Sequence, residues 1–195
     1  MARGAASVIV SIVAVAMAGL PGGCATPPGP MAGGPSGAWP LSEVRLGALG
    51  HDVVGPGSER GGADLSAEAL FVKPWTSTDP FLNALLPRPD IGGTADFSGR
   101  TSEAYAGVAW DYDLTSRIFV ESGLGGSVND GRTEKNVAGH LALGSNVLFR
   151  ESASLGYRLT PNWSVMATVE HMSDAGLAPQ NAGLTNAGIR FGYAF

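Results

Sequence analysis

The sequence predicts an all-β fold: an eight-stranded antiparallel transmembrane β-barrel of the kind found in the outer membrane of Gram-negative bacteria. The first of three observations is composition, because 44% of the 195 residues are hydrophobic and only 15% are charged, whereas about 25% are charged in a typical soluble domain. The second is an N-terminal export signal with no later run of about 18 apolar residues, the length that indicates a spanning helix. The third is a series of short segments in which apolar and polar residues alternate. An exported apolar chain without a spanning helix can cross a membrane only as a closed barrel, because open sheet edges leave backbone groups unpaired in lipid.

Residues 1–24 are predicted to be a signal peptide. Arg3 precedes an almost uninterrupted apolar run over residues 5–20, which has the length of a signal-peptide core rather than of a spanning helix. Residues 16–18 (Ala-Met-Ala) form a cleavage site of the A-x-A type. Cys24 offers a lipoprotein site instead, although a proline stands where a lipobox has a leucine-like residue, so lipidation of Cys24 stays open.

Residues 25–40 are rich in proline and glycine and are predicted to be a flexible periplasmic lead. The barrel itself is expected over residues 41–195. Its strands are predicted near residues 42–51, 64–73, 88–98, 102–113, 116–127, 146–159, 163–174 and 186–195.

Alternation is clearest in the last two of these strands. One face of the segment 163–169 carries Trp163, Val165, Ala167 and Val169, and the other carries Ser164, Met166 and Thr168. The final strand has Ile189, Phe191, Tyr193 and Phe195 on one face, and Gly188, Arg190, Gly192 and Ala194 on the other. An apolar exterior around a small or polar lumen produces this period of two. The alternative, a soluble lipocalin-like barrel that binds a ligand, requires more charges on its outer face than these glycines and alanines supply.

The connections between strands predict which end of the barrel is which. If both termini are periplasmic, the connections 114–115 and 160–162 are short periplasmic turns, and 128–145 and 175–185 are longer extracellular loops. The connection 74–87 is an exception. There, Asp79 as N-cap and a proline in the first helical position predict a short interfacial helix.

His171 and Ser173 are the candidate chemical groups. They lie two residues apart near the outer end of a strand, on the same predicted lipid-facing side as Val169. Polar groups on that side cost free energy, and a nucleophile with its general base requires this side-by-side arrangement. The structural alternative is a pair of polar residues at the membrane boundary.

Residues 169–195 resemble the C-terminal signature of the PagL-type lipid A 3-O-deacylases, in which an H-x-S-N segment precedes a loop with Asn and Gly and a last strand that ends in Phe. The matching positions here are His171, Ser173, Asn181 and Gly183. Segments 43–52, 67–71 and 148–157 also resemble the family, so the similarity extends along the barrel.

The resemblance implies a carboxylic ester hydrolase that releases the 3-position acyl chain of lipid A in the outer leaflet of the outer membrane. It implies Ser173 as nucleophile, His171 as general base, and Asn181 with Gly183 around the oxyanion or substrate. The expected partners are lipopolysaccharide and outer-membrane lipid, with a homodimer as a further expectation. The resemblance implies no cofactor and no metal, and the three histidines lack metal-ligand spacing.

Two positions depart from the family pattern. Asp174 replaces the Asn that follows the serine, and Thr185 stands where the family has the Glu that orients the histidine. A hairpin centred on Pro161 places Glu151 opposite His171 on the lipid-facing side, which makes Glu151 the candidate third catalytic residue. Its structural alternative is a boundary glutamate paired with an arginine.

The formal net charge of −5 gives no basis for a nucleic-acid partner. Apart from the ligand-binding barrel, the rival to the hydrolase is a catalytically silent structural or adhesion barrel of the outer membrane. The missing Glu at position 185 favours this rival, whereas the shared face of His171, Ser173 and Glu151 favours the enzyme.

Overall fold

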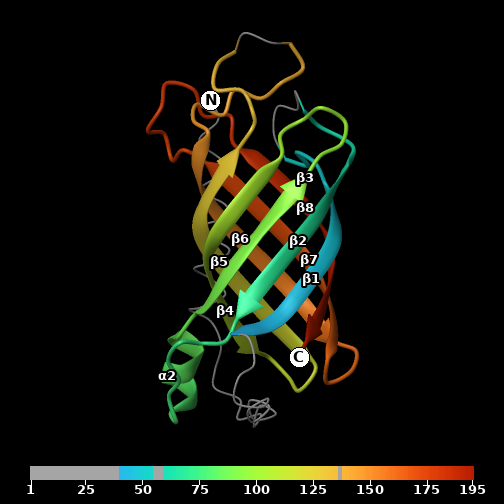
Figure 1. The fold of residues 1–195 in the computed structure, drawn as a ribbon, viewed down its shortest axis with the longest axis vertical. Helices are drawn as coiled ribbons and strands as arrows, with labels where there is room; N and C mark the ends of the chain where they lie inside the picture. The colour runs from blue at the N-terminus through green and yellow to red at the C-terminus, as the bar shows by residue number, and fades with distance from the viewer. Residues whose placement is uncertain (1–39, 55–58, 136–137) are drawn as a thin grey trace.

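The computed structural model describes residues 40–54, 59–135 and 138–195. Eight strands form one closed antiparallel barrel in which each strand pairs with its neighbours in the sequence and the first pairs with the last (Figure 1). They are β1 (Leu41–Gly50), β2 (Ala63–Phe71), β3 (Arg88–Ala95), β4 (Glu103–Asp113), β5 (Ile118–Asn129), β6 (Val147–Arg158), β7 (Trp163–Ser173) and β8 (Leu184–Ala194). The predicted fold is therefore confirmed. The predicted signal peptide, and the lead up to residue 39, lie outside the described residues.

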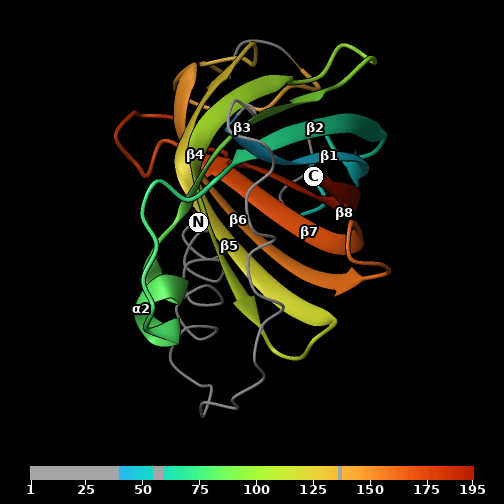
Figure 2. The same ribbon diagram turned by 60° about the horizontal axis from the view of Figure 1, so that its bottom comes forward.

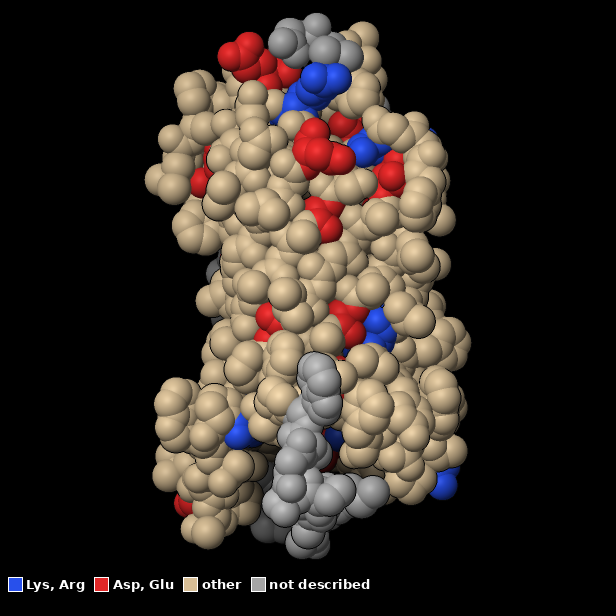
Figure 3. Space-filling view, in the orientation of Figure 1, with Lys and Arg blue, Asp and Glu red and all other residues tan. Residues whose placement is uncertain are grey.

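The period of two in the sequence sorts side chains between the lumen and the exterior. Outward positions carry large exposed apolar side chains, among them Leu46, Leu65, Ile91, Leu124, Leu155, Ile189 and Phe191. Charged side chains cover only a small part of the face seen in Figure 3. A wall of this kind is stable only if its outer surface faces lipid rather than water, because exposed apolar patches of such extent are unfavourable in water.

The lumen is filled by buried ion pairs. Arg45, which is 1% exposed, contacts Glu121 at 2.6 Å. Arg150 and Arg190 share the carboxylate of Glu170 at 2.9 and 2.8 Å. Buried charges of both signs must be paired in this way, because an unpaired one loses its hydration without compensation. The alternation of the last strand places Arg190 on its lumen face, and this is confirmed.

The two ends of the barrel differ. The described parts of the connections 51–62 and 130–146, and the connections 96–102 and 174–183, lie at one end, which we call the loop end (Figure 1). The opposite end carries the short turns and the helix α2 (Pro80–Leu85), whose N-cap Asp79 accepts hydrogen bonds from two backbone N–H groups of the first turn. The predicted short helix is thus present. In the described residues, no helix is long and apolar enough to cross a membrane.

A small apolar core closes the lumen at the loop end. It consists of Leu141, Leu143, Leu148, Met172 and Leu184, all at most 3% exposed. These residues come from the β5–β6 connection and from the loop-end termini of β6, β7 and β8. The core therefore holds together the part of the wall that carries the candidate catalytic residues.

Candidate active site

Three outward-facing residues form a row across neighbouring strands. β6, β7 and β8 follow one another around the wall (Figure 2), and their registers pair Glu151 with His171 and His171 with Thr185. The register predicted from the hairpin at Pro161 is the one observed. Residues directly opposite each other in an antiparallel pair have Cβ atoms about 5 Å apart. Both neighbours of His171 in the row are therefore close enough to act on its imidazole.

The imidazole of His171 is buried although it lies on the outer face of the barrel. The residue is 6% exposed, and its Nδ1 lies 2.8 Å from the hydroxyl oxygen of Thr185. Its Nε2 is also buried and has no hydrogen-bond partner in the part of the chain that the structure describes. When Nδ1 donates to Thr185, Nε2 carries the lone pair and is ready to accept a proton.

Thr185, rather than the predicted third residue Glu151, contacts the imidazole of His171. Among the described residues, no hydrogen bond joins Glu151 to His171, and the hydrogen bond to Nδ1 involves Thr185 instead. The short threonine side chain reaches the imidazole directly because the two residues are cross-strand partners. The sequence signal for this contact is the position of Thr185 in the family motif, where the family has the Glu that orients the histidine.

Ser173 lies on the same outward face, one pleat beyond His171 toward the loop end, and is half-buried. No hydrogen bond joins Ser173 to His171 within the described residues. The cross-strand partner of Ser173 is Phe149, and Phe149 lines a hollow of about 260 Å³ together with Val147 and Leu177. A hollow lined by these apolar side chains and by Asp174 therefore adjoins the candidate nucleophile.

The loop that follows Ser173 is organised by Asp174. Its carboxylate accepts hydrogen bonds from the backbone N–H groups of Gly176 at 2.7 Å and Ala178 at 3.1 Å. The negative charge that replaces the family's Asn is therefore used to fold the loop. Asn181 accepts the backbone N–H of Asp174 through its Oδ1 at 3.4 Å, which leaves its amide NH₂ group as a donor.

Gly183 packs against the edge of the His171 imidazole. Its φ is +67°, and a Cβ atom at this position would lie 2.9 Å from Cε1 of His171. Both the backbone conformation and the close approach require glycine. The loop thus places Asn181 and Gly183, the two remaining predicted site residues, next to the row.

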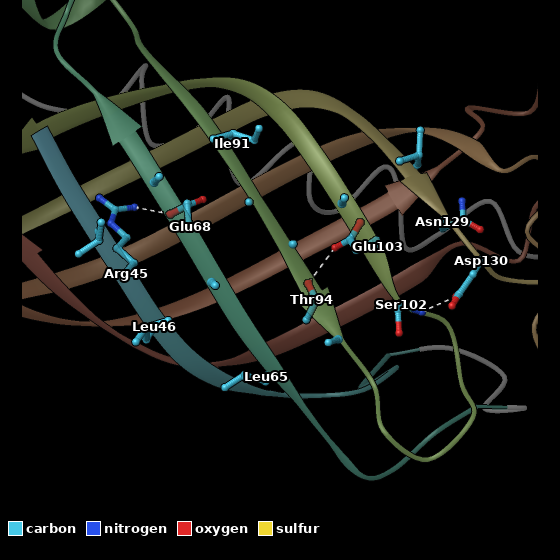
Figure 4. A pocket seen from close by; sticks show the side chains of 18 residues that line it. Arg45, Leu46, Leu65, Glu68, Ile91, Thr94, Ser102, Glu103, Asn129 and Asp130 are labelled. Carbon is cyan, nitrogen blue, oxygen red and sulfur yellow. Dashed lines mark hydrogen bonds and ion pairs between the residues drawn. The ribbon is translucent and has the colours of Figure 1, made fainter. Parts of the chain in front are cut away.

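A larger hollow of about 890 Å³ lies over β1–β4 (Figure 4). Its lining includes Leu46, Leu65 and Ile91, and it contains neither His171 nor Ser173. The arrangement of β6, β7 and β8 is therefore the better candidate for an active site.

Comparisons with known proteins agree with this assignment of the fold. A family model described as "Lipid A 3-O-deacylase (PagL)" matches residues 83–194, a range that contains every residue discussed for the site. The crystal structure of the outer membrane enzyme PagL is similar over 80% of this chain and 99% of that chain, with 18% sequence identity and a TM-score of 0.52. A de novo designed transmembrane β-barrel is similar over 80% of this chain and 96% of its own, with 13% identity and a TM-score of 0.50. No curated protein sequence gives a match.

Proposed function

The chain belongs to the lipid A 3-O-deacylase (PagL) family, and from this membership we propose that it is a carboxylic ester hydrolase that removes the 3-O-linked acyl chain of lipid A. The observation that supports the proposal best is the buried imidazole of His171. Its Nδ1 is held by Thr185, its Nε2 has no partner in the described residues, and Ser173 follows on the same face. A serine esterase needs this combination of an oriented base and a neighbouring hydroxyl.

The position of these groups suits a substrate that is itself a lipid. The wall of the barrel is apolar and belongs in the outer membrane, and the candidate site opens outward near the loop end. With the loop end facing outside the cell, the site lies at the level of the outer leaflet, where lipopolysaccharide resides. An acyl chain can then approach Ser173 sideways, along the apolar surface that includes Val147 and Phe149, without leaving the membrane.

The proposed reaction proceeds through an acyl-enzyme. Nε2 of His171 takes the proton from the Ser173 hydroxyl as its oxygen attacks the ester carbonyl carbon, and the side-chain amide of Asn181 donates a hydrogen bond to the resulting oxyanion. The intermediate collapses as the C–O bond to the sugar breaks, and the proton on Nε2 passes to the departing 3-hydroxyl group. A water molecule, deprotonated by the same nitrogen, then releases the fatty acid and restores Ser173.

We assign separate roles to the two neighbours of His171. Thr185 accepts the Nδ1–H and fixes the tautomer and the orientation of the ring, which a hydroxyl oxygen can do without charge. Glu151, one strand away, supplies the negative charge that stabilises the imidazolium formed during attack. The family's single carboxylate is thus replaced by two residues on opposite sides of the histidine.

The experiment is a mass spectrum of lipid A from cells that express the full chain. Wild-type protein should remove one 3-O-acyl chain, whereas Ser173→Ala and His171→Ala should leave lipid A unchanged and still give a folded, heat-modifiable barrel. Ser122→Ala is the matched control, because Ser122 is another outward-facing serine, on β5, two strands from β7 and outside the row of Glu151, His171 and Thr185. Unmodified lipid A with wild-type protein would leave the silent barrel as the function, and full activity of either site variant would exclude the His171–Ser173 pair.

A further inference from the structure

A buried charged cluster lies at the loop end, beside the candidate active site. His51 directly follows β1, and both of its ring nitrogens contact carboxylates: Nδ1 lies 2.7 Å from Oδ2 of Asp64, and Nε2 lies 3.1 Å from Oε2 of Glu59. All three side chains are fully buried. We call these residues, together with His140, the rim cluster.

Glu59 connects the rim cluster to two other loops. Its carboxylate accepts the backbone N–H of Thr101 at 3.1 Å and that of Leu141 at 3.0 Å, and it lies 3.2 Å from Nδ1 of His140. Thr101 belongs to the β3–β4 connection, and Leu141 belongs to the β5–β6 connection and to the apolar core at this end. One carboxylate therefore fixes three of the four loops at the loop end.

The chain after His51, and the chain after Leu141, whose N–H donates to Glu59, each reach a segment that flanks His171. Immediately after His51, the N–H of Val53 donates to the backbone oxygen of Thr185 at 2.8 Å, and the N–H of Asp52 donates to Oδ1 of Asn186 at 3.1 Å. Immediately after Leu141, the backbone oxygen of Ala142 accepts the N–H of Ala182 at 3.0 Å. The hydrogen bond from Val53 holds Thr185, the residue proposed to orient the imidazole. The hydrogen bond to Ala142 holds the segment between Asn181 and Gly183.

We infer that the His51–Glu59 pair is a positioning unit for the active site, because it fixes both Thr185 and the 181–183 segment around the imidazole of His171. The inference rests on the proposed function. It adds two residues that touch neither the reacting atoms nor His171 and act through the backbone of their neighbours.

His51 and Glu59 are both charged at neutral pH, so each stabilises the charge of the other, and the loss of either charge disrupts the contact. Burial alone would lower the pKa of His51, but hydrogen bonds with Asp64 and Glu59 outweigh burial and raise the pKa from 6.5 to about 9. Burial would raise the pKa of Glu59, but hydrogen bonds from His51, Leu141 and Thr101 lower it to about 2. When one partner of a buried ion pair is removed, the other charge is left without compensation, and the surrounding backbone has to rearrange.

A metal site is the alternative interpretation of the same residues. His51, Asp64 and Asp96 each place a potential ligand atom within 4.8 Å of the others. However, both nitrogens of His51 already contact carboxylates, and Asp96 accepts the backbone N–H groups of Ser98 and Arg100 at 2.7 and 2.9 Å. A metal ion needs a nitrogen lone pair, and a histidine that is protonated between two carboxylates has none. The contacts therefore favour the positioning role.

The test compares Glu59→Gln with Glu59→Asp in purified full-length protein acting on lipid A in detergent micelles. Glu59→Gln removes the charge, and we expect kcat per folded molecule to fall at least about 10-fold, because a misplacement of about 1 Å costs up to about 100-fold. KM should change less than about 3-fold, since no group that binds the substrate is altered. Glu59→Asp should restore most of the lost kcat. The control is Asp113→Asn, which removes a shorter, partly exposed ion pair with Arg158 (2.6 Å) at the opposite end of the barrel and should leave kcat unchanged.

Several outcomes would overturn the inference while leaving the proposed function intact. They are an unchanged kcat in Glu59→Gln, a loss explained entirely by a smaller folded fraction, and loss of wild-type activity in EDTA with recovery on addition of Zn²⁺. If Glu59→Gln does not yield a heat-modifiable barrel, His51→Gln provides the same comparison, because it removes the charge from the other partner. An inactive wild-type protein would instead refute the proposed function itself.

Discussion

At position 185, a hydroxyl oxygen lies 2.8 Å from Nδ1 of His171, and in the proposed mechanism it takes the orienting role that the resemblance assigns to a family Glu. We predict that Thr185→Val, which keeps the shape and removes the oxygen, lowers kcat about 10-fold, since a buried nitrogen that loses its partner costs about 1–3 kcal/mol. Thr185→Glu should raise activity above wild type by combining orientation and charge. Deacylation rates of the purified variants measure both effects. Thr168→Val, which removes a hydroxyl from the lumen, is the control, and normal turnover in Thr185→Val would contradict the role of Thr185. The sequence, by contrast, predicts only Glu151 as the third catalytic residue.

Glu151 should contribute through its charge alone. It lies opposite His171 but makes no hydrogen bond with it among the described residues. We predict that Glu151→Gln lowers kcat on the order of 100-fold. A loss of this size corresponds to the Coulomb energy of two charges about 5 Å apart at an effective dielectric constant near 20. The barrel should stay folded, since the side chain lies on the outer face. The variant Glu134→Gln, in an exposed loop, should behave as wild type. A loss of less than about 3-fold in Glu151→Gln would show that the imidazolium is stabilised by other means.

Substitution of Gly183 tests whether the 174–183 connection fixes the position of the His171 imidazole. An added methyl group would lie 2.9 Å from Cε1 of His171, and the φ of +67° is also unfavourable for alanine. Gly183→Ala should therefore reduce turnover at least about 10-fold by displacing the ring. Gly176→Ala separates the two causes, because Gly176 has a φ of +82° but open space around its Cβ position. We expect Gly176→Ala to keep its activity, and equal losses in both variants would attribute the effect to backbone strain rather than to the imidazole.

At the scale of elements, the strands were predictable and the loops were not. Alternation located all eight strands to within a few residues, and the proline turn at 160–162 gave the β6–β7 register that pairs Glu151 with His171. The contact between Thr185 and His171 depends on the register of β7 with β8, and the connection 174–183 carries no comparable turn signal. In the rim cluster, Glu59 contacts His140, which lies 81 positions away in the sequence, and no local sequence pattern indicates such a contact.

The loop that carries His51 should make the stability of the barrel depend on pH. The pKa of His51 is about 9 in the folded protein, above the ordinary value of 6.5. Its protonated form therefore stabilises the fold fully below pH 6.5, and this stabilisation is lost as the pH rises through 9. The titratable groups around it are Asp64 of β2, Glu59, Asp52 and Arg60 of the β1–β2 connection, Asp96 of the β3–β4 connection, and His140 of the β5–β6 connection. The temperature at which the heat-modifiable band shifts should fall between pH 6.5 and 9 in the wild type. It should change much less over this range in His51→Gln, and parallel curves for the two proteins would contradict the assignment.

At the scale of the whole molecule, the same period of two produces an apolar wall that faces lipid and a lumen that is filled by buried ion pairs. The sequence indicated that Glu68, Arg150 and Arg190 face inward. It did not indicate which charges meet, because the partners come from strands on different sides of the barrel, such as β1 and β5. The proposed function depends on this separation of the apolar wall from the charged lumen. Because side chains fill the lumen, a membrane lipid can reach catalytic residues only on the outer face.

The lumen network predicts that stability and catalysis can be changed independently. Arg45 pairs with Glu43, Glu68 and Glu121 at 2.7, 3.0 and 2.6 Å. Arg45→Met should leave these carboxylates with only their remaining, longer contacts to Arg88, Arg150 and Arg190. It should lower the free energy of unfolding by about 3–5 kcal/mol, the usual loss when one partner of a buried pair is removed. Leu46→Ala at the next position is the control, because Leu46 points outward and is 61% exposed, so its truncation should change stability far less. Urea unfolding of the detergent-solubilised barrel measures the difference. Activity per folded molecule should stay at the wild-type level in Arg45→Met, since Arg45 faces the lumen and β1 is separated from β7 by β8. A fall in kcat of the folded fraction would show instead that the lumen network and the outer face are coupled through the wall.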